Sequence, residues 1–189
     1  MSREVLVSLR KNQLSEVQGK VLEIGLGTGV NIPLYPESLQ SLTTVDKNGA
    51  LNILAEHRIR MSPLLVEHWV LNAEQLPMVS DTFDTVVSTM TLCSIEQVSR
   101  AIQEIFRVLK AGVSFLFLEH GKSSDSQIAK WQRRLTPFSR MFGDGCHLDR
   151  DIPGLIQKER FNMESIHTFP LEQTPAVVGC MYQGIARKP

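Results

Sequence analysis

The sequence VLEIGLGTGVN, residues 21–31, decides the fold of this chain. An apolar run, Val21 to Ile24, has the composition of a buried strand, and glycines then occupy every second position from Gly25 to Gly29. Glycines at this density let the backbone adopt positive φ and let a ligand approach closely. The stretch predicts a strand, a tight turn and a helix start whose free N–H groups face a carboxylate or phosphate. Taken alone, it is also compatible with an ordinary βα turn packed tightly by glycines.

The spacing of the glycines separates two kinds of nucleotide site. The dinucleotide fingerprint is G-x-G-x-x-G, but here the third glycine comes one residue early and Val30 occupies the last glycine position. Glu23 is an acid inside an apolar strand, and its burial is costly unless a polar partner is present. The pattern E-x-G-x-G-x-G therefore points away from a dinucleotide domain.

Length and composition restrict the class of protein. A chain of 189 residues fits one domain, expected over residues 20–189 with residues 1–19 as a short helix or arm. A formal charge of zero argues against a general nucleic-acid binder. No apolar run approaches the ~20 residues needed to span a bilayer, and no signal peptide is recognisable. Three scattered cysteines form no disulfide framework, so we expect a cytoplasmic protein.

Strand and helix patterns alternate along most of the chain, which indicates an α/β fold with a parallel sheet and helices on both faces. Strands are expected over 41–46, up to about Asn72, over 83–89 and over 113–121, and two final strands form a hairpin-like end. Expected helices cover 30–39, 50–60, 99–112, with Gly112 as the cap, and 124–142, and a short helix precedes the final strands.

Polar residues lie at the ends of the second and third strands, where ligands bind in open α/β sheets. Asp46 has a carboxylate suited to two ribose hydroxyls, although a turn or helix-cap aspartate is common. Asn72 and the N–H of Ala73 suit an adenine edge, and an ordinary polar loop is an equally good reading of these two residues alone.

Five segments resemble class I S-adenosylmethionine (SAM) dependent methyltransferases in order and spacing. They are VLEIGLGTGVN, TTVDKN, NAEQLP, FDTVVSTMTLCSI and IFRVLKAGVSFLFLEHG, within residues 20–121. The pattern is similar to the UbiE-like group, and most similar to alkyl thiol methyltransferase-like proteins in TLCS (91–94), FLEH (117–120) and DGC (144–146). The resemblance implies a Rossmann-like fold with a seven-stranded, mostly parallel sheet and an antiparallel last strand.

The resemblance also implies SAM as the cofactor, S-adenosylhomocysteine as the product, and roles for several residues. Gly25 and Gly27 would admit the methionyl group, Glu23 would orient the loop or meet the ammonium through water, and Thr89 would offer backbone atoms. Residues 89–93 would border the methyl group. The full expected cofactor set is Glu23, Gly25, Leu26, Gly27, Asn31, Asp46, Lys47, Asn72, Ala73, Glu74 and Thr89.

This chain departs from those relatives at its N-terminus, where they carry a longer, often hydrophobic segment. A lid over the site is either missing or supplied by residues 1–15. Membrane anchoring is not implied; no membrane span is expected, peripheral contact remains open, and the protein is expected to be a monomer or dimer.

Methyl transfer is an in-line displacement, so the main task of the protein is to orient acceptor and methyl. A base helps an acceptor that must lose a proton. Base candidates are His120, Asp144 and His147, each with a structural role as an equally good alternative. Cys146 and His147 are adjacent, which is poor spacing for a metal pair, so no metal is expected.

The sequence thus predicts an enzyme that methylates a small-molecule acceptor, namely a thiol, amine, quinol or lipid headgroup. Two alternatives remain. A non-catalytic SAM-binding module would keep the cofactor motifs without turnover, and an NAD(P)-binding oxidoreductase is disfavoured by the glycine spacing.

Overall fold

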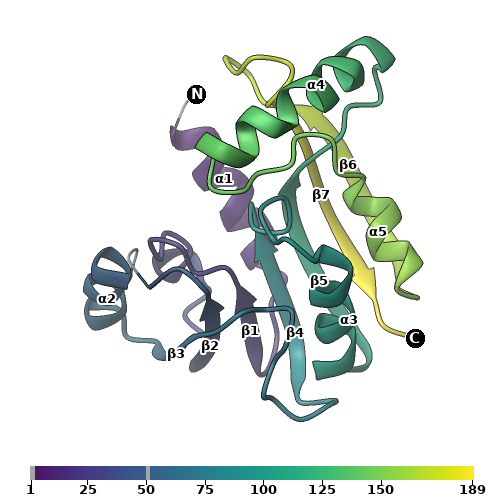
Figure 1. Cartoon of the computed structure of the whole chain (residues 1–189). Helices are drawn as coiled ribbons and strands as arrows, with labels where there is room; N and C mark the ends of the chain where they lie inside the picture. The colour runs from purple at the N-terminus through teal and green to yellow at the C-terminus, as the bar shows by residue number, and fades with distance from the viewer. Residues whose placement is uncertain (1–2, 50–51) are drawn as a thin grey trace.

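The computed structural model describes residues 3–49 and 52–189, which form a seven-stranded sheet with helices packed on it (Figure 1). The elements in chain order are α1 (Arg3–Leu14), β1 (Val21–Ile24), the 3₁₀ helix η1 (Ile32–Leu34), β2 (Ser41–Asp46), α2 (Asn52–Met61), β3 (Leu65–Val70), β4 (Phe83–Thr89), α3 (Val98–Val108), β5 (Leu109–His120), α4 (Ser126–Phe142), α5 (Ile152–Lys158), β6 (Asn162–Pro170) and β7 (Cys180–Arg187).

The strand order is β3-β2-β1-β4-β5-β7-β6. The pairs from β3 to β5 are parallel, whereas β7 runs antiparallel to both of its neighbours. This arrangement confirms the expected mostly parallel sheet with an antiparallel last strand. Since β1, β2, β4 and β5 point the same way, their carboxyl ends meet at one edge, where a ligand site is expected.

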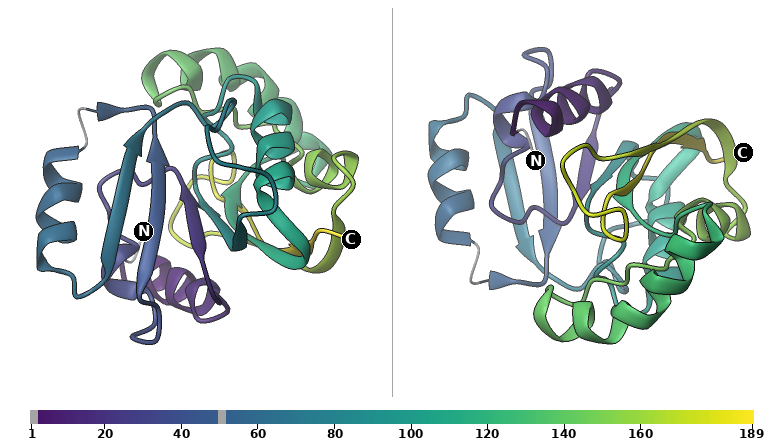
Figure 2. Two further views of the ribbon diagram at one scale, coloured as in Figure 1. Left: turned by 90° about the horizontal axis from the view of Figure 1, so that it is seen from below. Right: turned by 90° about the horizontal axis from the view of Figure 1, so that it is seen from above.

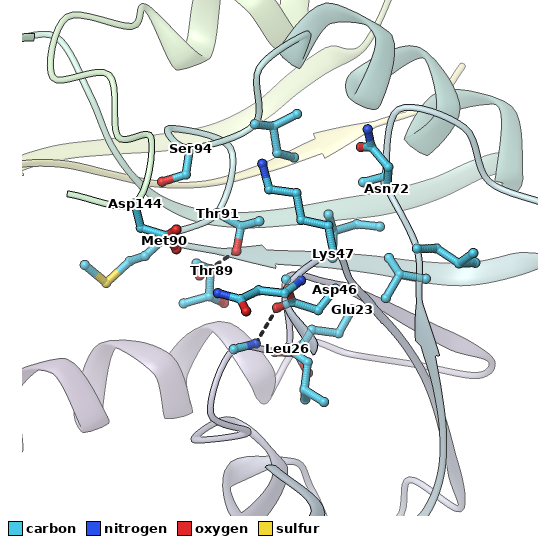
Figure 3. Close-up of a pocket in the computed structure, with 18 of the residues that line it drawn as sticks. Glu23, Leu26, Asp46, Lys47, Asn72, Thr89, Met90, Thr91, Ser94 and Asp144 are labelled. Carbon is cyan, nitrogen blue, oxygen red and sulfur yellow. Dashed lines mark hydrogen bonds between the residues drawn. The ribbon is translucent and has the colours of Figure 1, made fainter. Parts of the chain in front are cut away.

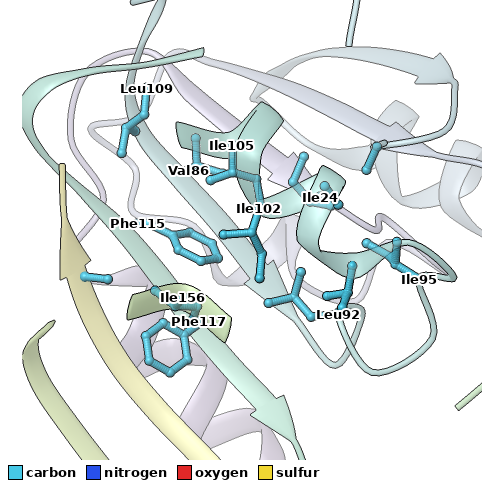
Figure 4. Close-up of a cluster of buried hydrophobic side chains, with 14 of the residues drawn as sticks. Ile24, Val86, Leu92, Ile95, Ile102, Ile105, Leu109, Phe115, Phe117 and Ile156 are labelled. Atoms are coloured by element: carbon cyan, nitrogen blue, oxygen red, sulfur yellow. The ribbon is translucent and has the colours of Figure 1, made fainter. Parts of the chain in front are cut away.

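The sheet is covered on both faces, as predicted (Figure 2). On one face, α3 and α5 bury a large apolar cluster against the central strands (Figure 4). The apolar positions of α3 recur at helical spacing, and Ile102 and Ile105 are fully buried. On the other face, Leu14 at the end of α1 is fully buried with Val21 and Val87, and Leu6 and Leu9 of the same helix pack against Leu118 and Met181.

Two expected helices differ from the structure. The segment after the glycine turn forms only the 3₁₀ turn η1, because Pro33 and Pro36 each lack a backbone donor and restrict a longer helix. The helix expected to end at Gly112 ends at Val108, and β5 begins at once. Gly112 instead has φ of +75° within β5, near an irregularity in the pairing with β4. The predicted cap role of Gly112 is therefore wrong, and the residue lies at a strand irregularity rather than at a helix end.

Other boundaries agree closely with the sequence. β4 spans Phe83–Thr89 as expected and is buried at nearly every position. The third strand ends two residues before Asn72. The helix expected over 50–60 is present as α2 from residue 52, and residues 50–51 lie outside the described part. The N-terminal segment forms helix α1 rather than an extended arm.

Candidate active site

A cavity of about 290 Å³ opens at the carboxyl edge of the sheet, above β1, β2 and β4 (Figure 3). Its walls contain every residue of the expected cofactor set except one, Asn31. Asn31 lies directly behind the wall, where it bonds to three residues that do line the cavity, Arg10, Glu23 and Thr89. The structure therefore brings the dispersed sequence motifs to one place, although the individual cofactor roles stay predictions.

All three glycines of the turn have positive φ, and the first two differ in what surrounds them. Gly25 has φ of +82°, and a Cβ there would overlap the side chain of Thr91. Gly27 has φ of +55°, and a Cβ there would meet no atom within 4 Å. The first glycine is thus required by packing against the β4 end, whereas the second leaves open space on the cavity side for a ligand.

Glu23 occupies the floor of the cavity and is only 1% exposed. Its Oε1 accepts a hydrogen bond from Asn31 Nδ2 at 2.7 Å, and its Oε2 accepts one from the Tyr35 hydroxyl at 3.1 Å. These are the polar partners that a buried acid needs. Burial nevertheless raises the pKa of Glu23 to about 7, and the two hydrogen bonds offset that effect only in part.

Asp46 holds the glycine turn in place. Its Oδ2 accepts from the Gly27 N–H at 2.7 Å, and its Oδ1 accepts from the Asn48 N–H at 2.8 Å. A carboxylate has about four lone-pair sites, so acceptor capacity remains for ribose hydroxyls. Asn72 uses its Oδ1 to accept from the Glu74 N–H at 3.0 Å, which leaves its NH₂ group for an adenine edge.

Helix α1 contributes a wall residue that the sequence reading missed. Arg10 lines the cavity and donates from Nη1 to Asn31 Oδ1 at 2.6 Å. Gln13 of the same helix donates to the Ser88 carbonyl, and its side-chain oxygen accepts from Thr89. A lone arginine in a short helix belongs to no recognisable motif, so the sequence could not identify Arg10 itself. The expectation that residues 1–15 could supply a lid was its only indication that this helix borders the site.

The far end of the cavity is built from the turn after β4. Met90, Thr91, Ser94 and Ile95 line this end. Of the range 89–93 expected to border the methyl group, residues 89–91 line the cavity, whereas Leu92 and Cys93 are buried outside its wall. Thr91 is held by the buried Glu119, whose carboxylate accepts from the Thr91 N–H at 3.0 Å. Burial raises the pKa of Glu119 to about 7.

The three base candidates occupy three different environments. Asp144 lines the cavity, as Figure 3 shows beside Met90 and Ser94. His120 is 5% exposed, lies behind the wall and has its Nδ1 3.6 Å from Cys146 Sγ. His147 lines a neighbouring depression with Ser94 and Arg140. Only Asp144 therefore reaches the cavity among the three.

Cys93, His120 and Cys146 lie together behind the far end of the cavity, although they are distant in sequence. Their ligand-type atoms all lie within 4.8 Å of one another. Hydrogen bonding with Cys93 and His120 lowers the pKa of the Cys146 thiol. The pKa of the Cys93 thiol is raised, first by its hydrogen bond with Cys146 and then by burial. The sequence argument against a metal site considered only short spacings and could not detect this cluster.

The fold and the cavity define a Rossmann-like enzyme that binds an adenosine-containing ligand at the carboxyl edge of its sheet. Residues 22–117 match the family described as the methyltransferase domain. The chain therefore belongs to the methyltransferase-domain family and is a SAM-dependent methyltransferase. The lining fits such a cofactor, since Gly27 leaves open space and Asp46 and Asn72 keep hydrogen-bonding capacity beyond their contacts within the chain.

Similar proteins act on different acceptors. The chain is 33% identical over 166 residues to thiol S-methyltransferase TMT1B of Rattus norvegicus, covering 85% of this chain and 67% of that protein. It is 26% identical to phosphatidylethanolamine N-methyltransferase of Cereibacter sphaeroides, covering 87% and 77%. A solved SAM-dependent methyltransferase from Methanosarcina mazei has a TM-score of 0.70 at 24% identity, covering 92% and 95%.

Proposed function

We propose that this protein methylates the sulfur of a small, lipophilic thiol. The observation that carries the proposal is the far end of the cavity, where Asp144 is the single titratable side chain among the described residues of that end, beside Met90, Thr91, Ser94 and Ile95. Of the acceptor classes considered, a thiol ionises closest to neutral pH and needs the least assistance from a base. The similarity to a thiol S-methyltransferase supports the same class.

The chain's own residues perform three tasks in this reaction. SAM, when bound, supplies an activated methyl group on a positively charged sulfur. Glu23 would hold the ammonium of the methionyl group, and Arg10 would hold its carboxylate, because charge-assisted hydrogen bonds are the stronger ones. Asp46 and Asn72 would hold the ribose and adenine. Thr91 and Ser94 border the acceptor, and Asp144 accepts the thiol proton.

A competition assay tests the acceptor class. The full chain is incubated with isotopically labelled SAM and, in separate reactions, with a short alkyl thiol, an alkyl amine, a quinol or vesicles of phosphatidylethanolamine. We expect the S-methyl thioether to form fastest, identified by mass spectrometry. Faster methylation of the amine, quinol or lipid would overturn the thiol assignment while leaving SAM-dependent transfer intact.

Residues 20–189 are proposed as one catalytic domain, with α1 as its lid. Arg10 and Gln13 of α1 bond to residues of the cavity and of β4, so replacing both with Ala should weaken SAM binding while Leu14 keeps α1 packed on the sheet. A cytoplasmic location is proposed from the free state of all three cysteines. Among the described helices, none is long and apolar enough to cross a membrane.

The composition of helix α4 favours peripheral contact between this helix and an anionic membrane. Such a membrane would be a source of lipophilic methyl acceptors. Its exposed apolar side chains are Trp131, Phe138, Met141 and Phe142, between 54% and 80% exposed. Its charged residues are all basic: Lys130, Arg133, Arg134 and Arg140. An exposed face of this composition binds anionic lipid surfaces.

Vesicle co-sedimentation tests this contact. Binding should be stronger to vesicles containing phosphatidylserine than to pure phosphatidylcholine, and Phe138→Ser should weaken it. Val79→Ser is the matched control, since Val79 is 77% exposed on a different segment. Equal loss of binding in both variants, or no preference for anionic vesicles, would remove α4 as the contact surface.

A further inference from the structure

We propose that Cys93, His120 and Cys146 form a binding site for a zinc-like divalent cation. The three residues come from the turn after β4, the end of β5 and the turn after α4. Each offers one atom of a type that zinc prefers, namely two thiolate sulfurs and one imidazole nitrogen. This inference concerns a site behind the cavity and does not depend on which acceptor is methylated.

The topology explains why these residues meet. β4 and β5 are parallel neighbours, with Thr89 paired to Leu118, so the segments that leave their carboxyl ends start side by side. The chain returns after α4, and the His147 N–H donates to the Cys93 carbonyl at 2.8 Å. That backbone hydrogen bond places Cys146 next to the other two residues.

The distances suit a tetrahedral ion. Zn–S bonds of about 2.3 Å and Zn–N bonds of about 2.0–2.1 Å at tetrahedral angles separate a sulfur from a nitrogen by roughly 3.6 Å. The Cys146 Sγ to His120 Nδ1 distance is 3.6 Å. The three ligand atoms all lie within 4.8 Å of one another, so small rotations of the Cys93 side chain complete the set.

Burial and charge also fit a cation. Cys93 and His120 are 4% and 5% exposed, whereas Cys146 is half-buried. Two thiolates and one divalent cation form a neutral unit, which removes the cost of burying isolated charges. The half-buried side leaves room for a water molecule as the fourth ligand, the arrangement of three protein ligands and one open position known for zinc.

The imidazole of His120 has no strong hydrogen bond to another described residue. Its Nδ1 has only the long contact to the Cys146 sulfur at 3.6 Å, and its Nε2 is buried without a hydrogen-bond partner within residues 3–49 and 52–189. No competing hydrogen bond therefore occupies Nδ1, the nitrogen that faces the sulfur and would bind the cation.

A bound cation would fix the turn after α4, which carries Asp144 and Cys146, at the far end of the cavity. Cys146 lies two residues after Asp144, which lines the cavity. A cation that joins Cys146 to the ends of β4 and β5 therefore fixes the position of Asp144. Metal loss should lower kcat for the methyl acceptor with little change in SAM affinity.

Metal content and cobalt substitution test the site on the full chain. We expect one Zn²⁺ per chain after purification in a phosphine reductant without chelator, and a thiolate-to-cobalt charge-transfer band on titration with Co²⁺. Cys93→Ser and Cys146→Ser should each weaken binding at least ~10-fold, because each loses a thiolate ligand. Cys180→Ser is the matched control, since Cys180 is a free, buried cysteine outside the cluster.

A measurement on the unmodified chain covers the case in which a variant fails to fold. Zn²⁺ should slow alkylation of Cys146, read by peptide mass spectrometry, while alkylation of Cys180 stays unchanged. Absence of the cobalt band and of this protection in the reduced protein would overturn the proposal. Undiminished metal binding by Cys93→Ser and Cys146→Ser would overturn it as well.

Discussion

The carboxylate of Asp46 accepts a hydrogen bond from the backbone N–H of Gly27 at 2.7 Å. This contact joins the end of β2 to the glycine turn after β1, although the two residues are 19 positions apart. Asp46 therefore has two structural roles, since its carboxylate holds the glycine turn and its side chain also lines the cavity. The glycine turn and the acidic residue therefore form one structural unit in the wall of the cavity.

Asp46→Ala should weaken SAM binding, because it removes both the ribose acceptor and the partner of the Gly27 N–H. A hydrogen bond to a charged group contributes roughly 1.5–3 kcal/mol, which corresponds to about a 10–150-fold rise in Kd by calorimetry. Glu37→Ala, on an exposed position of another segment, serves as the control. Unchanged SAM affinity in the Asp46 variant would rule out its role at the ribose.

Arg10→Ala should weaken SAM binding about 10-fold or more, because a charged hydrogen bond to the methionyl carboxylate is lost. Arg10→Lys should recover only part of the affinity, since lysine keeps the charge but lacks the planar fork. Calorimetry with 5′-methylthioadenosine, which has no methionyl carboxylate, gives the internal control. Equal losses for both ligands would show that Arg10 acts only through the packing of α1.

The two glycines should respond differently to alanine. Gly25→Ala places a Cβ against Thr91 at a positive φ, so it should lower the melting temperature markedly. Gly27→Ala meets no neighbour within 4 Å and should cost only about 1–2 kcal/mol of left-handed backbone strain, while its methyl group obstructs SAM. Thermal unfolding and SAM titration separate the two effects, and equal melting temperatures would contradict the packing argument.

Glu23 should make the protein less stable as pH rises. Its pKa is raised from 4.5 to about 7 by burial, so the protonated form is favoured in the folded state, and this stabilisation is lost as pH rises from 4.5 through 7. The shift corresponds to about 3 kcal/mol. Arg10 opposes the shift and Asp46 reinforces it.

Urea unfolding of the wild-type chain and of Glu23→Gln across this pH range checks the effect. The difference in the free energy of unfolding should move in favour of the variant by about 3 kcal/mol as pH rises. Glu119, whose pKa is also raised to about 7, contributes equally to both proteins and cancels. A pH-independent difference would mean that Glu23 titrates normally.

Asp144→Asn tests the base at the far end of the cavity. Asp144 has φ of +51°, a conformation that asparagine tolerates well, so the turn should be preserved. Loss of a general base should lower kcat by roughly 10²–10⁴-fold with an unchanged Kd for SAM. Recovery of the rate with an acceptor thiol of lower pKa would support proton removal, and a fully active variant would exclude it.

Local patterns were sufficient to predict the sheet and most of the cofactor site. Alternating apolar runs predict buried strands, and parallel strands bring their carboxyl ends to one edge, so Glu23, Asp46, Asn72 and Thr89 follow from their places at strand ends. Helix boundaries were less predictable. Val108 ends α3 because Leu109 pairs with Phe83 of β4, a long-range contact that outweighs local helix preference.

The sequence by itself determined the class of enzyme, because glycine spacing and strand-end residues depend on backbone geometry that repeats within a few residues. Only the tertiary structure decided that Arg10 of α1 reaches the cavity, that Asp144 rather than His120 lines it, and that Cys93, His120 and Cys146 lie together. These residues are separated by 24 positions or more, except where Asp144 and Cys146 share one turn. Their proximity depends on how helices pack over the sheet, which no short sequence pattern encodes.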